Sequence, residues 1–405
     1  MARFVGTSGK DNFKGGSGND AFIFDVRNMS HVDKIVGGKG ADGLFLNNSN
    51  SGTWASVVPA NWAVMSGIDG VGLTSNYGAY GFKLAFTNAF YNADKVANFE
   101  ILATSLTGVA QGLHVSASTV SKMDFTIAGT LGGEDKITTG SKNDVIIYAQ
   151  NSLNIRDQIN GGKGVDTLVL AGAGAPRGVK DGPTYNDPHG STFLGNVKNI
   201  EKIVVTNLSA NQDRSISFGA EFGQGYTGTG TVKITTDANY GSHKAAVAID
   251  GKLIVDGTRL KADQIIDVTG GKNGDILYGG AGNDKLSGGA GNDTIKGGFG
   301  SDTMTGGAGA DTFIFSNLND STPGARDVIA DFHQFEGDKI FFQHTNSAPF
   351  SFIGAEAFHG VAGEIHSFAS GGQTIVELDQ NGDGGADFAI ALNGNMTLTA
   401  YDFSL

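Results

Sequence analysis

Aspartates recur at nine-residue intervals in the C-terminal third of the chain, each inside a glycine-rich stretch. From Gly270 the sequence reads GGKNGDILY, GGAGNDKLS, GGAGNDTIK, GGFGSDTMT and GGAGADTFI. The copies share the form G-G-x-G-x-D-x-U-x, in which U is apolar, and the first copy departs from it at Asn273 and Gly274. The first six residues suit a turn, because glycine permits backbone angles that other residues avoid. The last three suit a short strand that buries U.

This spacing predicts a site for a hard cation. Carboxylate and carbonyl oxygens are the ligands that Ca²⁺ prefers. Turns stacked on one side of a coil would bring their aspartates together, and these carboxylates would repel one another without the ion, so we expect folding to depend on calcium. The predicted ligands are Asp275, Asp284, Asp293, Asp302 and Asp311, with the neighbouring turn glycines Gly279, Gly280, Gly282, Gly288, Gly289, Gly291, Gly297, Gly298, Gly300, Gly306, Gly307 and Gly309.

Six further copies form two triplets upstream. The first triplet covers 6–14, 15–23 and the nonapeptide from Gly37, and the second covers 130–138, 139–147 and the nonapeptide from Gly161. The triplets are offset by 124 residues, and each has 13 residues before its third copy, which indicates a duplicated module. We expect the third copy to pair with the first, because alternate turns face opposite sides. The predicted ligands are Asp11, Asp20, Asp42, Asp144 and Asp166, while Asp135 is compatible with an ordinary surface acid.

Other segments favour β-structure. A D-x-I element recurs at Asp33–Ile35, Asp157–Ile159 and Asp327–Ile329, where it fits a strand returning after a polar loop. Asp250–Gly251 lies between two apolar runs and predicts a β-hairpin over 245–257. Residues 54–66 are compatible with a short helix broken near Pro59.

The repeats resemble those of the RTX family, and residues 265–405 resemble the RTX domain that follows the catalytic domain in serralysin-type proteases. The matching stretches there are 306–332, 352–366 and 379–405. The V-x-N-x-E phrases at 96–108 and 197–209 are similar to segments of bacterial RTX surface-layer proteins. The resemblance implies type I secretion through an uncleaved C-terminal signal, here TLTAYDFSL, and folding outside the cell or at the bacterial surface.

The expected fold class is all-β, with right-handed parallel β-roll segments (an RTX solenoid) and β-rich insertions. We expect three modules, at 1–128, 129–264 and 265–405, the last with its five repeats at 270–314.

Several other patterns in the sequence have more than one interpretation. Asp379, Asn381, Asp383 and Asp387 have the oxygen spacing of an EF-hand-like loop, and a polar hairpin turn is the alternative. His359, Glu364 and His366 favour a solvated strand over a metal site. Residues 38–43 match G-x-G-x-x-G only as a by-product of the repeat, so dinucleotide binding is rejected. The aromatic residues of the first insertion favour core packing over a sugar-binding patch; they are Trp54, Trp62, Tyr77, Tyr80, Phe82, Phe86 and Tyr91.

The composition and the absence of several motifs reduce the number of candidate functions. The net charge of −13 disfavours nucleic acid as a partner. No apolar run is long enough for a membrane span, and the N-terminal residues MARFVGTSGKDNF lack the apolar stretch expected of a signal peptide. There is no cysteine, no H-E-x-x-H motif and no G-x-S-x-G motif. We therefore expect no enzyme, but a secreted calcium-binding structural protein that self-associates into a lattice or filament, with cell-surface polysaccharide as a candidate partner. The alternatives are an adhesin or glycan-binding protein, and a glycan-active lyase or epimerase.

Overall fold

The computed structural model describes residues 1–30, 33–48, 55–57, 65–75, 81–88, 98–103, 112–129, 134–149, 153, 156–171, 191–194, 196–205, 214–217, 231–236, 252–343 and 349–404. The chain divides into two compact units. Unit 1 comprises Met1–Asn186, Gly195–Val204 and Gly223–Gly228, and unit 2 comprises Asp187–Leu194, Val205–Phe222 and Thr229–Leu405. The division into three modules stays a prediction.

Unit 1 is built from parallel strands that alternate along the chain between two faces. One face holds β1 (Arg3–Val5), β3 (Ala21–Asp25), β5 (Gly43–Asn48), β8 (Gly70–Ser75), β10 (Asn98–Leu102), β12 (Asp124–Ala128), β14 (Val145–Ala149), β16 (Thr167–Ala171) and β19 (Lys202–Val205). The other face holds a three-stranded sheet and a six-stranded sheet. These are β2 (Asn12–Lys14), β4 (Lys34–Val36) and β7 (Met65–Ser66), then β6 (Ala55–Val57), β9 (Phe82–Ala85), β11 (Leu113–Ser116), β13 (Lys136–Thr138), β15 (Gln158–Asn160) and β18 (Val197–Lys198).

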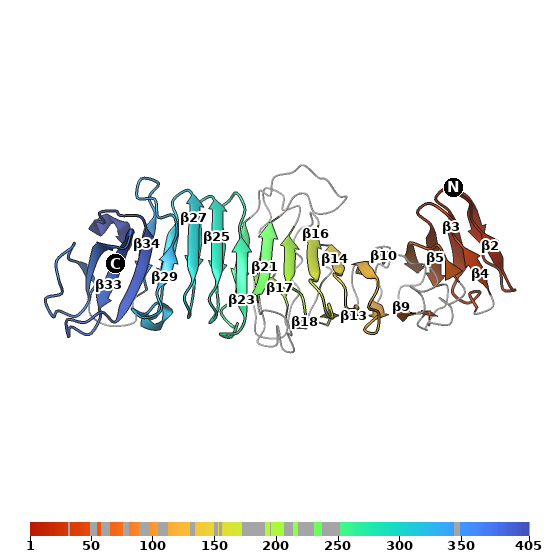
Figure 1. Ribbon diagram of the computed structural model, residues 1–405, viewed down its shortest axis with the longest axis horizontal. Coiled ribbons are helices and arrows are strands. Elements are labelled where there is room, and N and C mark those ends of the chain that lie inside the picture. Colours follow the sequence, from red (N-terminus) through yellow and green to blue (C-terminus); the bar gives the residue numbers. More distant parts are fainter. Residues whose placement is uncertain are drawn as a thin grey trace. The chain divides into compact units, whose positions relative to one another are not determined.

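Unit 2 repeats this arrangement, and Figure 1 shows β23, β25, β27 and β29 side by side. One face holds β21 (Thr231–Thr236), β23 (Ile265–Thr269), β25 (Lys285–Ala290), β27 (Thr303–Ala308) and β29 (Asp327–Ile329). The other holds β17 (Ser191–Phe193), β20 (Arg214–Ser217), β22 (Leu253–Asp256), β24 (Ile276–Tyr278), β26 (Thr294–Lys296), β28 (Thr312–Phe315), β30 (Lys339–Phe342) and β35 (Phe403–Ser404).

An antiparallel segment follows the parallel strands of unit 2. It consists of the antiparallel strands β32 (Glu364–Ser370), β33 (Gln373–Asp379) and β34 (Phe388–Asn393). At its edges, β31 (Ser351–Phe352) pairs in parallel with β32, and β34 pairs in parallel with β29. Two short 3-10 helices, η1 (Leu318–Asp320) and η2 (Ala400–Asp402), lie in the loops. Within the described residues, no helix has the length and hydropathy needed to cross a membrane.

The apolar position of each nonapeptide lies in the core between the two faces. Leu277, Leu286, Ile295, Met304 and Phe313 are all fully buried. Because side chains alternate along a strand, a three-residue strand buries one side chain and turns its two neighbours outward. The expected all-β fold of parallel β-roll segments is confirmed.

Two local predictions fall mainly outside the described residues. The turn predicted at Asp250–Gly251 lies outside them, and β22, which follows it, pairs in parallel with β20 on one edge and with β24 on the other. Of the short helix considered for 54–66, the described residues 55–57 and 65–66 form the strands β6 and β7, and the rest lies outside the described residues.

Candidate metal centre

Buried aspartates form two ladders in unit 2, one before each face. In each rung the backbone N–H of one aspartate donates to Oδ1 of the aspartate in the next turn on the same side. One side runs Asp275 to Asp293 (2.6 Å), Asp293 to Asp311 (2.8 Å) and Asp311 to Asp338 (2.9 Å); the other runs Asp284 to Asp302 (2.7 Å) and Asp302 to Asp327 (2.8 Å). None of these side chains is more than 2% exposed, although aspartate is normally a surface residue.

The hydrogen bonding of the second carboxylate oxygen, Oδ2, differs between the first turn on each side and the turns stacked on it. Oδ2 of Asp275 and Oδ2 of Asp284 accept from the N–H of the second glycine in the same turn, at 2.6 and 2.7 Å. The corresponding atom has no hydrogen-bond partner in Asp293, Asp302, Asp311 and Asp327. Because a buried polar atom without a partner is costly, these oxygens suit a ligand that neutralises them.

Glycine is required where stacked turns approach each other. Gly298 has a φ of 101°, and a Cβ there would overlap the carbonyl oxygen of Gly280 in the turn below. A Cβ on Gly297 would overlap Oδ2 of Asp302. The leading glycine pair of the repeat therefore leaves room for the carboxylate and for the neighbouring carbonyl.

The residue before each aspartate also joins successive turns. Oδ1 of Asn283 accepts from the N–H of Ser301 at 2.9 Å, and Oδ1 of Asn292 accepts from the N–H of Ala310 at 3.0 Å. The asparagines of the G-N-D sequence thus hold the turns in register beside the carboxylates. This role of the asparagines was not predicted from the repeat pattern.

Burial raises the pKa of the ladder carboxyl groups. It raises the pKa of Asp293 to about 7, that of Asp302 to about 8 and that of Asp327 to about 9. The negative charge of neighbouring carboxylates adds to the effect of burial, for example that of Asp302 on Asp327. Near neutral pH these groups can all be ionised only if a cation compensates their charge.

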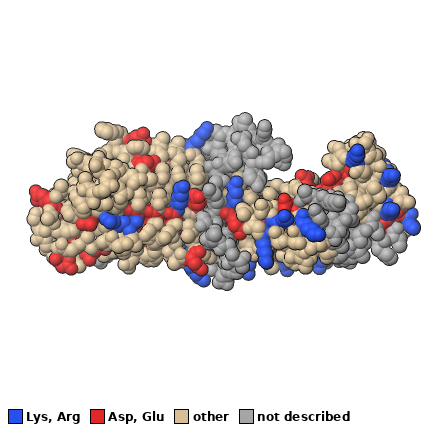
Figure 2. Space-filling view, in the orientation of Figure 1, with Lys and Arg blue, Asp and Glu red and all other residues tan. Residues whose placement is uncertain are grey.

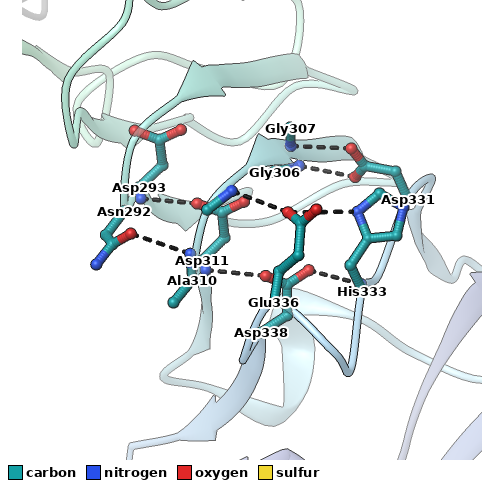
Figure 3. A network of polar contacts seen from close by, with 11 residues as sticks. Asn292, Asp293, Gly306, Gly307, Ala310, Asp311, Asp331, His333, Glu336 and Asp338 are labelled. Carbon is teal, nitrogen blue, oxygen red and sulfur yellow. Dashed lines mark hydrogen bonds and ion pairs between the residues drawn. The ribbon is translucent and has the colours of Figure 1, made fainter.

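A closing loop, residues 331–338, ends one side of the array (Figure 3). Asp331 accepts from the N–H groups of Gly306 and Gly307 at 2.8 and 2.9 Å, and Glu336 accepts from the N–H of Gly309 at 2.9 Å. Asp338 occupies the last rung and also accepts from the N–H of His333 at 2.7 Å. The loop thus satisfies the amides of the last turn with side-chain carboxylates.

Unit 1 contains similar ladders, in which Asp69 accepts through Oδ2 and Glu201 through Oε2. The rungs run Asp11 to Asp33 (2.9 Å), Asp20 to Asp42 (2.7 Å), Asp42 to Asp69 (2.7 Å), Asp135 to Asp157 (2.8 Å), Asp144 to Asp166 (2.7 Å) and Asp166 to Glu201 (2.6 Å). Oδ2 of Asp42 and Oδ2 of Asp166 have no hydrogen-bond partner. Burial raises the pKa of Asp166 to about 8 and that of Asp144 to about 6.

The pairing within each triplet differs from the prediction. The third repeat stacks on the second, as the rungs from Asp20 to Asp42 and from Asp144 to Asp166 show. The first repeat pairs instead with the D-x-I element of the spacer. The reason is that the 13-residue spacer acts as one elongated turn, which returns the third repeat to the side of the second. Asp135 is also not a surface acid: it is 1% exposed and lies on the ladder.

Several rungs come from residues that the repeat pattern did not identify. They are Asp33, Asp69, Asp157, Glu201, Asp327 and Asp338. Each of them stands two residues before a buried aliphatic side chain, as Asp338 does before Ile340 and Glu201 before Ile203. The sequence signal for these rungs is therefore a three-residue pattern: an acid, any residue, then an aliphatic residue. This pattern is the D-x-U part of the nonapeptide without the preceding glycines.

The EF-hand-like loop is a hairpin loop between β33 and β34, which is the alternative that the sequence left open. Asp379 accepts from the N–H groups of Gly382 (2.6 Å) and Gly384 (2.8 Å), and Asp387 accepts from those of Gln380 (2.9 Å) and Asn381 (3.1 Å). Asp383 accepts from Gly385 N–H at 2.8 Å. A cation at Asp379, Asn381, Asp383 and Asp387 would compete with these bonds, and its binding there stays a prediction.

The remaining candidate residues have structural surroundings. His359 Nδ1 lies 2.7 Å from Glu364 Oε1, and His366 Nε2 lies 3.1 Å from Glu377 Oε2. Phe82 and Phe86 are core residues, at 0% and 2% exposure. Trp54, Trp62, Tyr77, Tyr80 and Tyr91 lie outside the described residues.

The donor set of the ladders fits calcium. It consists of carboxylate and carbonyl oxygens, which a hard cation prefers, and it includes buried oxygens that lack a partner. Among the described residues, no group of three or more His, Cys, Asp and Glu side chains is arranged to hold a metal. An ion would therefore rest on pairs of ladder aspartates, such as Asp284 with Asp302, and on turn carbonyls such as that of Gly280.

Comparison with known proteins supports this chemistry. The family model described as the RTX calcium-binding nonapeptide repeat matches four times, over residues 3–25, 269–304, 278–313 and 287–321. The resemblance to RTX repeats is thereby confirmed. The chain is also similar to the solution structure of the AlgE6R3 subunit from the Azotobacter vinelandii mannuronan C5-epimerase, at 28% identity over 35% of this chain and 77% of that chain, with a TM-score of 0.26. Among curated proteins no match was found.

Proposed function

We propose that this chain, which carries RTX calcium-binding nonapeptide repeats, is an extracellular structural protein whose rolls fold and then associate when they meet calcium. RTX nonapeptide repeats bind calcium, and proteins that carry them are typically secreted. The observation that carries the proposal is the stack of buried aspartates, six of which have a carboxylate oxygen without a hydrogen-bond partner among the described residues.

Calcium would act mainly on the free energy of folding. In its absence the ladder carboxylates are buried next to one another, which disfavours the folded coil at neutral pH. Ion binding would remove this cost, and because the unfolded chain has no preformed site, the binding free energy would become folding free energy. A chain made in a calcium-poor compartment would then stay unfolded until it reached a calcium-rich one.

Association would follow from the same architecture. Repetitive coils expose strand edges and regular surfaces, through which copies of a solenoid can associate. We propose that calcium orders these surfaces in the course of folding, so that a lattice or filament forms only in its presence. A surface-layer or extracellular-matrix protein would use such a device.

A calcium titration of the purified chain tests the proposal. Circular dichroism should show a cooperative gain of β-structure, and electron microscopy of the same samples should show assemblies that EGTA dissolves. Magnesium is the control cation, because it demands a tighter octahedral geometry than these loops offer. A chain that is equally folded and equally heat-stable after chelation would refute calcium-dependent folding. A folded but monomeric calcium form would refute association alone.

A further inference from the structure

An apolar row runs across the outer face of β1, β3, β5, β8 and β10 in unit 1. The residue after each buried apolar position faces outward, and the strand register aligns these residues side by side. From β1 to β10 the row reads Val5, Ile23, Phe45, Gly72 and Leu102. Val5 is 58% exposed, Phe45 42% and Leu102 47%. The next residue in register, Ala128 on β12, is 6% exposed, so the exposed part of the row ends at Leu102.

The neighbouring row on the same face is small in the middle and charged at its two ends. In the same strand order it consists of Arg3, Ala21, Gly43, Gly70 and Glu100. Arg3 and Glu100 are both exposed. A hollow of about 300 Å³ is lined by the two glycines of β8, with Phe45 on one side and Leu102 on the other. Glycine weakens a strand and often marks a place where another group approaches closely.

Unit 2 shows that the coil does not require an apolar outer row. The corresponding positions on β21, β23, β25 and β27 and after β29 hold Thr235, Thr269, Ser287, Thr305 and Ala330. The row of unit 1 therefore exposes apolar surface that folding alone does not explain.

The charge of this region suits contact with a second copy. Residues 1–103 contain eight Lys and Arg and eight Asp and Glu, although the net charge of the chain is −13. Figure 2 shows atoms of both signs on the described part of unit 1. Two copies of this region would not repel each other through net charge, and a net charge near zero favours association.

We propose that this face packs against the same face of a second copy, about a two-fold axis that runs parallel to β5. A two-fold interface uses one surface patch on both copies, so the patch must be complementary to itself. The axis exchanges β1 with β10 and β3 with β8, while β5 faces β5 of the second copy. The inference rests on the association part of the proposed function and names the surface for it.

Both rows are complementary under this exchange. In the charged row, Arg3 of each copy faces Glu100 of the other. In the apolar row, Ile23 of each copy faces the hollow over Gly72 of the other, and Phe45 faces Phe45. Aromatic pairs of this kind stabilise interfaces beyond their buried area. The face spans four strand spacings, about 19 Å, which is small for an interface, so we expect a weak dimer.

A cross-linking experiment tests the pairing directly, because the chain contains no cysteine of its own. Asn47 follows Phe45 by two residues on β5, so the axis would bring the two copies of position 47 together. Asn47→Cys is treated with a short bismaleimide in saturating calcium, and monomaleimide labelling corrects for reactivity. Ser287→Cys is the control, since Ser287 lies on the corresponding face of unit 2 and is also partly exposed. We expect Asn47→Cys to form covalent dimers about tenfold faster, because pairing raises the effective concentration of the thiols.

Charge reversal in the Asn47→Cys background tests the orientation. Arg3→Glu or Glu100→Arg alone places like charges opposite each other at both ends of the face. Each should slow cross-linking about tenfold, since two attractive pairs become repulsive. Arg3→Glu/Glu100→Arg restores opposite charges and should recover the original rate. Lys285→Glu, at an exposed position of unit 2, changes the net charge as Arg3→Glu does and should have no effect.

The apolar row is tested in the same background by Phe45→Ser, which should also slow cross-linking. Phe299→Ser is its control, because Phe299 is 47% exposed and lies in unit 2. Circular dichroism in calcium verifies that each variant is folded.

Equal rates for Asn47→Cys and Ser287→Cys would overturn the pairing, and so would a double charge reversal that fails to recover the rate. Electron microscopy of the same samples separates this result from the proposed function. If calcium-dependent assemblies form without faster cross-linking at position 47, association uses another face, and this inference alone falls. If neither assemblies nor cross-linked dimers form, the proposed association falls with it.

Discussion

Unit 1 and unit 2 build the same carboxylate ladder from chain segments of different length. In the nonapeptide block of unit 2, successive rungs on one side are 18 residues apart, as from Asp284 to Asp302. In unit 1 the separation is 22 residues from Asp144 to Asp166 and 35 residues from Asp166 to Glu201. The ladder therefore needs an acid before each buried aliphatic residue, and it tolerates loops of variable length between rungs.

The two units differ more in how many of their described buried carboxylate oxygens lack a hydrogen-bond partner. Among the described residues, four carboxylate oxygens without a partner belong to unit 2 and two belong to unit 1. In unit 1, rungs that lie in spacers have protein partners: Oδ2 of Asp33 accepts from the N–H of Ser30 at 2.6 Å. Spacer loops thus replace part of what an ion would supply, and the uninterrupted repeats of unit 2 should depend on calcium more strongly.

The largest expected effect is a regional response to chelation. On titration with EGTA, amide hydrogen exchange should lose protection in β24–β28 of unit 2 at a higher free calcium concentration than in β12–β16 of unit 1. The physical reason is the greater number of uncompensated buried carboxylates in unit 2. If protection were lost in both units at the same free calcium concentration, the two units would not differ in their dependence on calcium. If protection were lost in unit 1 first, unit 1 would be the more dependent of the two.

A second prediction concerns the stacked glycines. Gly298→Ala should destabilise the calcium form by about 3 kcal/mol, because alanine is strained at a φ of 101° and its Cβ would overlap the carbonyl oxygen of Gly280. Gly16 has the same repeat position in unit 1, lacks a positive φ and has open space around a Cβ. Gly16→Ala is therefore the matched control and should be nearly neutral in urea unfolding. Equal effects would show that stacking does not determine the need for glycine.

The sequence predicted the coils well and the rungs only in part. The regular block from Gly270 gave the strands, the buried apolar positions and the aspartates, because all three share the nine-residue period. Asp69, Glu201 and Asp338 escaped, since each belongs to a loop without the glycine pair. The pairing of Asp20 with Asp42 was missed for a related reason: whether a 13-residue spacer counts as one turn or two depends on how the loop folds, which the period does not reveal.

The pH dependence of stability should change sign with calcium. In chelator, the raised pKa values of Asp302 (about 8) and Asp327 (about 9) mean that the folded coil holds protons that the unfolded chain releases near pH 4. Their stabilising contribution is fully present below about pH 4 and is lost as the pH rises through 8–9. With calcium, the carboxylates must be ionised, so stability should fall on acidification. Thermal unfolding at pH 5.5 and pH 8.5, with and without EGTA, measures both slopes. Parallel slopes in the two conditions would count against ion binding at the ladder.

The smallest expected effect concerns a hydrogen bond that distinguishes the second triplet of unit 1 from the first. Tyr148 is fully buried, and its hydroxyl donates to Asp135 Oδ2 at 2.8 Å, whereas the equivalent position 124 residues earlier is Phe24 and Asp11 Oδ2 accepts from the N–H of Thr7. Tyr148→Phe should cost about 1–3 kcal/mol in urea unfolding, since it leaves a buried carboxylate oxygen without this bond. Tyr401→Phe, at a residue that is 85% exposed, is the control. A different outcome would be unchanged stability and tighter calcium binding in Tyr148→Phe. The hydroxyl of Tyr148 would then be bonded to an oxygen that an ion can use. In that case the second triplet would differ from the first by a hydrogen bond that substitutes for calcium.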